Sequence, residues 1–390
     1  MPRWNNWSGR LEDHPKAVRF IRTEEDAAAS VIAARDGQRS LRVAGAGHSH
    51  APLVISADEI LDISAMAGVL SVDESRKQVW VGAGTPIYML GPVLNQHGLA
   101  LHNQGDIDRQ FISGATATGT HGTGRSLMNL SSAVTALRLI DGEGNLRQLE
   151  QFELGDDFSA YPVHLGALGL VTAIQLQARD RFVLEEQTWE VEGVELAESL
   201  DEWVAENDRL EFFWYPSTDQ AQIKTMKESN EPPVYPLASE GSRRALSFEV
   251  LPNDRPHRHT EMEFSVSASD GLACFLEVRQ LLQKDFPDVV WPVEYRLLRE
   301  DPIWMSNAFE RDTVTISVHQ DVKLDESEYY AACERIFRSF GGRPHWGKVN
   351  YFDGQDFEQA YPKWADWWAA RDRLDPDGVF LNEYLRSIRP

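Results

Sequence analysis

Residues 42–53 read Arg-Val-Ala-Gly-Ala-Gly-His-Ser-His-Ala-Pro-Leu, a stretch with two glycines and two histidines. Its first residues end a predicted strand, after which Gly45 and Gly47 allow a tight turn with close backbone approach. The free N–H groups of such a turn suit an anion such as a pyrophosphate. A Rossmann fingerprint is excluded, because His50 stands where the third glycine belongs and no helix pattern follows. Taken alone, the stretch is also compatible with a tight turn that carries two incidental histidines.

The composition is that of an ordinary soluble globular protein. The chain has 390 residues, 42% of them hydrophobic and 25% charged, which is enough for two domains or one large one. The net charge of −23 argues against nucleic acid and anionic membranes as partners. The only cysteines, Cys274 and Cys333, give neither a metal-ligand spacing nor a disulfide framework, so we expect no metal. Without an apolar signal core or a membrane-spanning run, a cytoplasmic location is the expectation.

The first half of the chain alternates strands with a few helices. Thr23 and the acids after it predict a helix that runs to Arg35. A second helix is predicted to be capped by Thr85, with Pro86 as its first residue. Apolar and β-branched patterns predict strands over 40–44, 59–63, 78–83 and 134–140, the last entering a hairpin at 141–142, and a further strand after Gly166.

After about residue 180 the pattern changes to long strands separated by single amphipathic helices. This order is typical of an antiparallel sheet with helices on one face, so the fold class is α+β. The stretch 228–243 is rich in proline, glycine and serine and predicts an exposed loop. The predicted strands are 183–192, 211–215, 289–298 and 313–319, and the predicted helices are 196–207, 270–283, 326–340 and 357–371.

A second glycine-rich segment lies at 114–124 and reads Gly-Ala-Thr-Ala-Thr-Gly-Thr-His-Gly-Thr-Gly. Its backbone N–H groups and threonine hydroxyls, with almost no side-chain bulk, let a large flat cofactor or its phosphates lie against the main chain. A plain Gly/Thr loop is the alternative for one segment alone. Two such segments, each after a strand in the same half of the chain, favour a cofactor groove.

Four blocks in order resemble the vanillyl-alcohol-oxidase (PCMH-type) flavoproteins, in the branch of sugar-1,4-lactone oxidases and alditol oxidases. They are Gly45-Ala-Gly-His-Ser, the segment 114–124, Pro292-Val-Glu-Tyr-Arg, and Arg343-Pro-His-Trp-Gly-Lys. The resemblance implies a two-domain FAD-binding PCMH-type fold with a mixed antiparallel-sheet cap. The implied division is an FAD-binding domain over 1–180, a substrate-binding cap domain over 181–340, and a segment 341–390 that returns to the FAD domain and completes the active site.

The resemblance also implies FAD as cofactor, with its pyrophosphate over the two glycine-rich segments. His48 stands where family members carry a covalent 8α-histidyl bond to the flavin, a role that suits a neutral imidazole as nucleophile. His50 is extra to the pattern, and His121 is as readily a hydrogen-bonded loop histidine as a functional one. The implied cofactor-binding residues are Ala44, Gly45, Ala46, Gly47, His48, Ser49, Gly105, Ser113, Gly114, Thr118, Gly119, Thr120, His121, Gly122, Gly169 and Val171.

On the substrate side, Glu294 and Arg296 are two residues apart on a predicted strand, so they share a face and can pair. A surface ion pair is the alternative for these two. The resemblance places them and Lys348 in the catalytic site, with Lys348 to polarise or deprotonate the reacting hydroxyl. Ser317 and His319, which alternate on the next strand, are further candidates for substrate contact.

Two neighbouring residues bear on the acceptor and the substrate. The resemblance places Gly105 against the reactive flavin edge, where alanine in galactonolactone dehydrogenase hinders oxygen. Glycine here implies an oxidase that forms H₂O₂. Asp106 replaces the serine of alditol oxidase, which shifts the expected substrate from a simple alditol toward a lactone such as gulono- or arabinono-lactone. The alternatives are an alditol oxidase for xylitol- or sorbitol-like polyols, a dehydrogenase that uses a quinone or cytochrome, and a flavin-binding protein without turnover.

Overall fold

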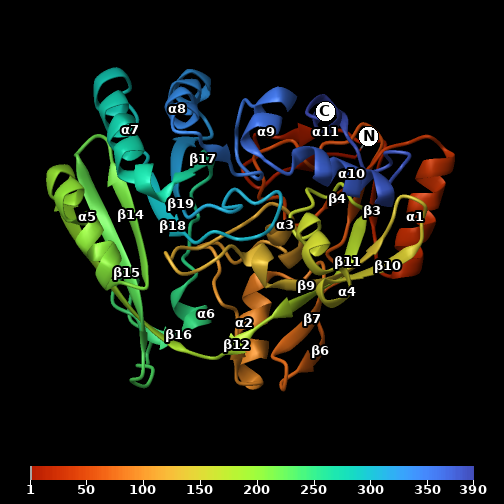
Figure 1. Ribbon diagram of the computed structural model, residues 1–390, viewed down its shortest axis with the longest axis horizontal. Helices are drawn as coiled ribbons and strands as arrows, with labels where there is room; N and C mark the ends of the chain where they lie inside the picture. Colours follow the sequence, from red (N-terminus) through yellow and green to blue (C-terminus); the bar gives the residue numbers. More distant parts are fainter. Residues whose placement is uncertain (1) are drawn as a thin grey trace.

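The computed structural model describes residues 2–390, and its strands form two groups with loops between them (Figure 1). One group combines a five-stranded antiparallel sheet, in the order β10-β9-β11-β7-β6, with a parallel sheet in the order β3-β5-β4. These strands are β3 (Ala17–Phe20), β4 (Leu41–Ala44), β5 (Glu59–Asp62), β6 (Val69–Asp73), β7 (Gln78–Gly82), β9 (Val134–Ile140), β10 (Leu146–Glu150) and β11 (Leu170–Gln177).

The helices of this part begin for different local reasons. α1 (Glu24–Asp36) is capped by Thr23, whose hydroxyl accepts from the Asp26 N–H at 3.1 Å, so this prediction is confirmed. The predicted Thr85 cap is wrong. The Thr85 hydroxyl donates to the Gly82 carbonyl at 2.6 Å, and α2 (Ile87–Gln96) starts after Pro86 with no side-chain cap. Thr85 is therefore used to close the turn that follows β7.

The predicted hairpin is present, since β9 and β10 pair antiparallel across the turn at Asp141. The second glycine-rich segment is only partly a loop, because α3 (Ile112–Ala117) includes its first residues. Short elements complete this half: β1 (Trp4–Asn5), β2 (Glu12–Asp13), β8 (Leu99–Ala100), η1 (Leu130–Ala133), α4 (Gln151–Leu154), η2 (Gly155–Ala160) and β12 (Arg179–Asp180).

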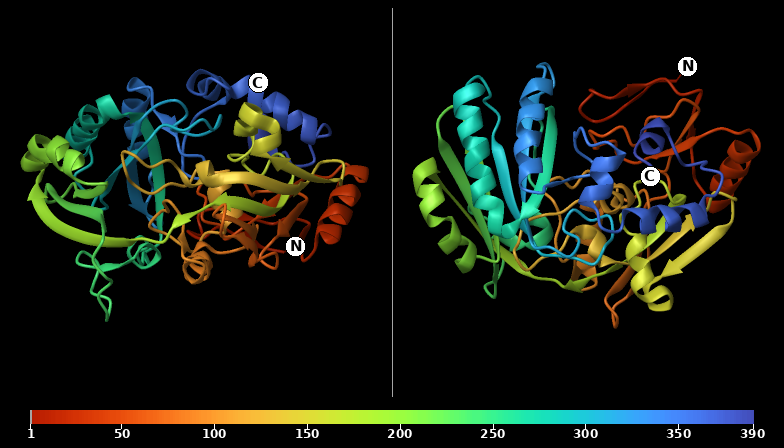
Figure 2. Two further views of the ribbon diagram at one scale, coloured as in Figure 1. Left: turned by 60° about the horizontal axis from the view of Figure 1, so that its bottom comes forward. Right: turned by 45° about the horizontal axis from the view of Figure 1, so that its top comes forward.

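The second group is an eight-stranded sheet in the order β16-β13-β15-β14-β18-β19-β17-β20, whose registered pairs are all antiparallel. Three helices stand side by side on one face (Figure 2), which confirms the predicted layer arrangement. The elements are β13 (Val183–Glu192), α5 (Gly193–Glu206), β14 (Arg209–Tyr215), β15 (Gln220–Ser229), β16 (Arg244–Leu246), α6 (Ser247–Val250), β17 (His259–Ser267), η3 (Ala268–Asp270), α7 (Gly271–Asp285), β18 (Val293–Leu298), β19 (Thr313–Asp321), α8 (Ser327–Ser339) and β20 (Arg343–Pro344).

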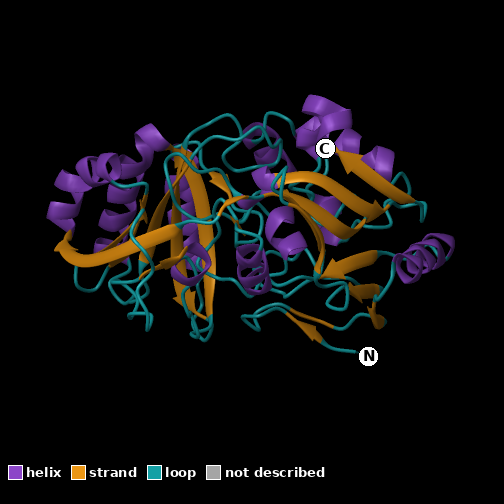
Figure 3. Cartoon of the chain, turned by 90° about the horizontal axis from the view of Figure 1, so that it is seen from below, coloured by secondary structure: helices purple, strands orange, loops and turns teal. Residues whose placement is uncertain are grey.

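Apolar residues at alternate positions of these strands pack under the helices. Phe212 of β14 stacks on Tyr295 of β18 with ring centroids 4.6 Å apart, and Phe275 of α7 meets Phe212 edge-on at 5.0 Å. The other face of the sheet is turned toward the loops that lie between the two groups of strands (Figure 3). Polar side chains therefore occupy the alternate positions on that face.

The last part of the chain links the two groups. β20 pairs with β17 in the eight-stranded sheet, and farther along Val379 accepts from the Leu41 N–H of β4 at 2.8 Å. The predicted single helix over 357–371 is wrong, because Pro362 separates α9 (Gly354–Ala360) from α10 (Trp364–Leu374). α11 (Glu383–Ser387) follows. No helix within residues 2–390 combines the length and apolar composition needed to cross a membrane.

Candidate active site

The polar face of the eight-stranded sheet is a grid of charged and hydroxylic side chains. Directly opposed residues of neighbouring strands point to the same face, and so do residues two apart in one strand. The register therefore defines three rows across β15, β14, β18, β19 and β17. They are Lys224, Glu211, Arg296, Thr315 and Ser265; Gln222, Phe213, Glu294, Ser317 and Glu263; and Gln220, Tyr215, His319 and Glu261, where Pro292, which directly precedes β18, lies between Tyr215 and His319.

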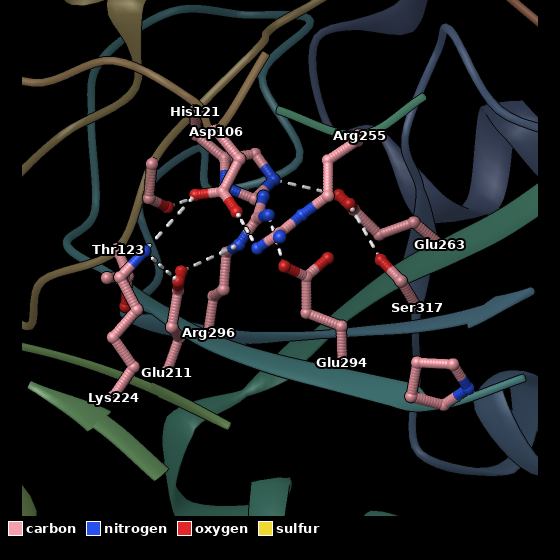
Figure 4. A network of polar contacts seen from close by, with 12 residues as sticks. Asp106, His121, Thr123, Glu211, Lys224, Arg255, Glu263, Glu294, Arg296 and Ser317 are labelled. Atoms are coloured by element: carbon pink, nitrogen blue, oxygen red, sulfur yellow. Dashed lines mark hydrogen bonds and ion pairs between the residues drawn. The ribbon is translucent and has the colours of Figure 1, made fainter. Parts of the chain in front are cut away.

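This grid forms one wall of a cavity of about 300 Å³. The opposite wall comes from loops of the first half of the chain, with Gly105, Asp106 and His121, and from the segment that carries His345 and Lys348. Figure 4 shows acids and cations of both walls in one network. The cavity thus brings together Glu294, Arg296, Lys348, His319 and Asp106, which are far apart in the sequence. Ser317 is buried and does not line the cavity, because its hydroxyl donates to Glu263 at 2.9 Å.

Glu294 and Arg296 pair as the alternation predicts, and a second acid shares the guanidinium. Arg296 donates to Glu294 through Nη2, while its Nε lies 3.3 Å from Glu211. Burial raises the pKa of Glu294 to about 8; the positive charge of Arg296 opposes this shift, and the charges of Glu211, Asp106 and Glu261 add to it. At neutral pH Glu294 is therefore a carboxylic acid that can donate as well as accept a hydrogen bond.

Glu294→Gln should keep the neutral, hydrogen-bonding form at every pH. The wild-type pKa lies near 8 in the folded chain and near 4.5 when unfolded, so folded Glu294 holds a proton that the unfolded chain loses between these values. This contribution to stability is complete below pH 4.5 and is lost as the pH rises to 8. Thermal melts across this window should show the wild type losing stability relative to Glu294→Gln. Parallel curves for the two proteins would contradict the raised pKa.

Asp106 is neutralised by two cations that the sequence analysis missed. Its carboxylate lies 3.0 Å from Arg255 and 4.0 Å from Lys224, and the Lys224 ammonium also lies 3.0 Å from Glu211. Although burial opposes ionisation, Lys224, Arg296 and Arg255 hold the pKa of Asp106 below its usual range. Asp106 is therefore an ionised acceptor. The sequence does show that Lys224 lies on the opposite face of its strand from its apolar neighbour Ile223. It does not show its partners Asp106 and Glu211, because they lie on other elements.

Two acids of β17 were also missed, although the alternation in His259-Thr-Glu-Met-Glu-Phe marks them. Glu261 pairs with the ammonium of Lys348. Glu263 lies 2.8 Å from Nε2 of His121 and accepts the Ser317 hydroxyl. Lys348 therefore enters the cavity with a carboxylate partner, and His121 has a specific contact in the site.

A separate groove lies between the first glycine turn and α3. Its lining includes many of the predicted cofactor-binding residues: Gly45, Ala46, Gly47, His48, Ser49, Ser113, Gly114, Thr118, Gly169 and Val171. Gly47 has φ +71° and Gly169 has φ +149°, so both turns need glycine. The His48 ring stacks on Trp7 at 5.5 Å. Burial, with the charges of Lys348 and His259, lowers the pKa of His48 to about 4, so its imidazole is neutral.

The groove carries features that fit FAD. His164, which the sequence analysis missed, lines it and is 4% exposed. Its Nδ1 accepts from the Gly166 N–H at 3.1 Å, so Nε2 carries the hydrogen in the neutral ring, and Nε2 has no partner within the described chain. At Gly114 a Cβ would meet nothing within 4 Å, which leaves this wall open. An anionic or carbonyl-bearing cofactor would accept the buried N–H.

The remaining predicted cofactor-binding residues do not line this groove. Gly105, Thr120 and His121 line the 300 Å³ cavity on its side nearest the glycine-rich segments. A Cβ at Gly105 would lie 3.0 Å from the His121 carbonyl oxygen, so even alanine is tight there. Ala44, Gly119 and Gly122 line neither cavity, and Gly122 instead allows close backbone approach to Gln104, whose carbonyl oxygen would lie 2.2 Å from an added Cβ.

Clusters of histidine and acid around Glu261 and Glu263 also raise the question of a metal. At Glu263, the His345 Nδ1 accepts the Gly347 N–H at 3.0 Å, so its Nε2 carries a hydrogen and offers no lone pair. At Glu261, the ammonium of Lys348 already occupies the carboxylate. Neither arrangement favours a divalent cation.

Comparison with known proteins gives matches along the whole chain. A family model described as D-arabinono-1,4-lactone oxidase matches residues 174–246 and 236–388, and one described as an FAD binding domain matches 15–150. L-gulono-1,4-lactone dehydrogenase of Mycobacterium tuberculosis is 35% identical, with 99% of each chain covered. L-gulonolactone oxidase of Bos taurus is 28% identical (99% and 98% covered), and alditol oxidase of a Streptomyces species is 26% identical (98% of each). The crystal structure of cholesterol oxidase from B. sterolicum shares the fold, with TM-score 0.86, 18% identity, and 100% and 96% of the two chains covered.

Proposed function

The chain belongs to the D-arabinono-1,4-lactone oxidase family of FAD-dependent oxidoreductases that act on CH–OH groups, and we propose that it oxidises an aldono-1,4-lactone with O₂ as acceptor. The observation that carries this proposal is the cavity in which Glu294, Arg296, Asp106 and Lys348 face one another beside the cofactor groove. We also propose that residues 1–180 bind FAD, that 181–340 form the substrate-binding cap, and that 341–390 complete the site.

Each of the cavity residues has its own role in the proposed reaction. Glu294 in its neutral form and Arg296 bind substrate hydroxyls or the lactone carbonyl, while ionised Asp106 accepts from another hydroxyl. Lys348 polarises the reacting hydroxyl and accepts its proton. His319 contacts the substrate from the next strand, and Ser317 acts only by fixing Glu263. Bound FAD would accept the hydride that leaves the carbon bearing the reacting hydroxyl.

The cofactor is proposed to lie in the groove lined by the first glycine turn and α3. Gly45, Ala46, Gly47, Ser49, Gly114 and Thr118 would hold its phosphates and ribityl chain, and His164 would donate its unpartnered N–H. Gly105 and His121 would face the flavin ring from the side of the substrate cavity. The neutral imidazole of His48 supports its proposed role as covalent tether.

The covalent bond gives a clear prediction. Acid-denatured wild-type protein should stay yellow and gain the mass of FAD in mass spectrometry. His48→Ala should lose the covalent flavin, whereas the matched variant His50→Ala should keep it. Retention in His48→Ala together with loss in His50→Ala would show that the tether is the other histidine.

The substrate and the acceptor are tested together. We expect peroxide formation with 1,4-lactones to exceed that with C4 to C6 alditols and small sugars, because Asp106 and the neutral Glu294 suit a compact polar ring. After anaerobic reduction by the best substrate, aeration should restore the oxidised flavin rapidly. Reoxidation over minutes would favour the second candidate, a dehydrogenase, which is the name of the Mycobacterium tuberculosis relative. A yellow protein that turns over nothing would favour a flavin-binding protein.

A further inference from the structure

A cluster of four residues has no assigned part in the proposed reaction: His50, His259, Glu261 and Trp7. His259 is the centre of this cluster. Its ring centroid lies 5.3 Å from that of His319, 5.4 Å from Trp7 and 6.1 Å from His50. A nitrogen of His50, a nitrogen of His259 and an oxygen of Glu261 all lie within 4.8 Å of one another. The cluster is therefore continuous with the Lys348–Glu261 pair in the substrate cavity.

The hydrogen bonds of the histidines decide where their protons are. Nδ1 of His259 lies 2.9 Å from the His257 carbonyl, and Nδ1 of His319 lies 2.9 Å from the Pro292 carbonyl. Because a carbonyl only accepts, each Nδ1 carries the hydrogen and each neutral ring has its lone pair on Nε2. Both Nε2 atoms lie 3.7 Å from Glu261. Two lone pairs and a carboxylate thus face one another, and such a group of acceptors is suited to receive a proton.

Alcohol oxidation produces a proton at this place. The O–H bond of the substrate breaks as its C–O bond becomes a carbonyl, and the hydride from the same carbon goes to FAD. The hydroxyl proton is left in a largely buried cavity. We propose that Glu261 and His259 carry this proton to solvent. Lys348 takes it as it gives one of its own to Glu261, and Glu261 passes that proton to Nε2 of His259.

Exposure distinguishes His259 as the outlet among the proton acceptors around Glu261; the Lys348 side chain, where the path begins, is 22% exposed. The His259 side chain is 16% exposed, against 9% for His319 and 7% for Glu261. His50 is 8% exposed, and burial and the charge of Lys348 lower its pKa, so it stays neutral beside the outlet. Once His259 has released this proton from Nε2, with its Nδ1 hydrogen still donated to the His257 carbonyl, every group in the path is back in its starting state. This assignment rests on the proposed function, because the proton comes from the oxidised hydroxyl.

The test is chemical rescue of His259→Ala. At low buffer concentration we expect kcat to fall about 10- to 100-fold, less than the loss of a group that takes the proton from the substrate itself, which typically contributes about 10²–10⁴-fold. Added imidazole should restore kcat in a concentration-dependent manner, and wild type should not respond. FAD content should be unchanged in the variant. His97→Ala is the matched control, since His97 lies on the surface beside Glu74, and it should behave as wild type.

Several outcomes would overturn the assignment. One is an unchanged kcat in His259→Ala, and another is a loss that imidazole does not restore while FAD content and the circular dichroism spectrum stay normal. If His259→Ala does not fold, His259→Gln and Glu261→Gln replace it, with the same rescue expected only for the histidine variant. Stoichiometric Zn²⁺ binding that His259→Gln abolishes, with activity lost to a chelator, would make the cluster a metal site instead. Failure of the proposed function is distinguishable, because wild type would then be inactive.

Discussion

Lys348→Met should lower kcat by about 10²–10⁴-fold, the range that a general acid or base contributes. Lys348 lines the cavity together with Glu294 and Arg296, and its ammonium is held in position by its pair with Glu261. Methionine keeps most of the side-chain volume but can neither donate nor transfer a proton. The rate of anaerobic flavin reduction measures the loss directly, because it excludes the reaction with O₂.

The control for this variant is Lys16→Met, which removes an exposed lysine paired with Asp58 and should leave the rate unchanged. FAD content should be the same in both variants, since Lys348 does not line the cofactor groove. If Lys348→Met reduced its flavin within a few-fold of the wild-type rate, Lys348 would have no part in the chemistry.

Arg296→Met should damage both stability and substrate binding. It removes the cation that pairs with Glu211 and donates to the neutral Glu294, and removing one partner of a buried ion pair typically costs about 3–5 kcal/mol. Lys224 remains 3.0 Å from Glu211, so this carboxylate keeps one partner. KM should rise strongly in the folded fraction, because the donors proposed to bind the substrate are gone. Urea unfolding and steady-state kinetics measure the two effects.

Arg296→Lys separates these two effects. It keeps the positive charge but loses the planar fork of donors, so most of the stability should return while KM stays high. As a control for stability, Arg3→Met breaks an exposed pair with Glu12 and should cost at most about 1 kcal/mol. Wild-type KM in Arg296→Lys would mean that only the charge at this position matters.

The sequence predicted the layers well because they depend on local periodicity. Apolar alternation along 183–192 and 313–319 predicts long strands, and the Thr23 cap is a contact between neighbours in the chain. Two predictions about helices were wrong because of a nearby group. The Thr85 hydroxyl donates to the Gly82 carbonyl instead of capping α2, and Pro362 divides the predicted helix over 357–371 into α9 and α10.

The candidate site was predicted only in part, because its charges are balanced across strands. Glu294 and Arg296 could be paired from their spacing in one strand. Glu261, Lys224 and Arg255 could not be assigned, since each finds its partner on another element: Glu261 meets Lys348, and the two cations meet Asp106. Strand register, which no motif in the sequence gives, is what assembles the grid.

We propose that a sugar-derived CH–OH group is oxidised in this cavity while bound FAD is reduced. This proposal is tested most directly by mixing the holoprotein with an aldono-1,4-lactone under anaerobic conditions and following the visible absorbance of the flavin. We expect complete, saturable bleaching in the wild type and bleaching slower by about 10²-fold or more in Lys348→Met. No bleaching with any 1,4-lactone or alditol, or equal rates in the two proteins, would contradict it.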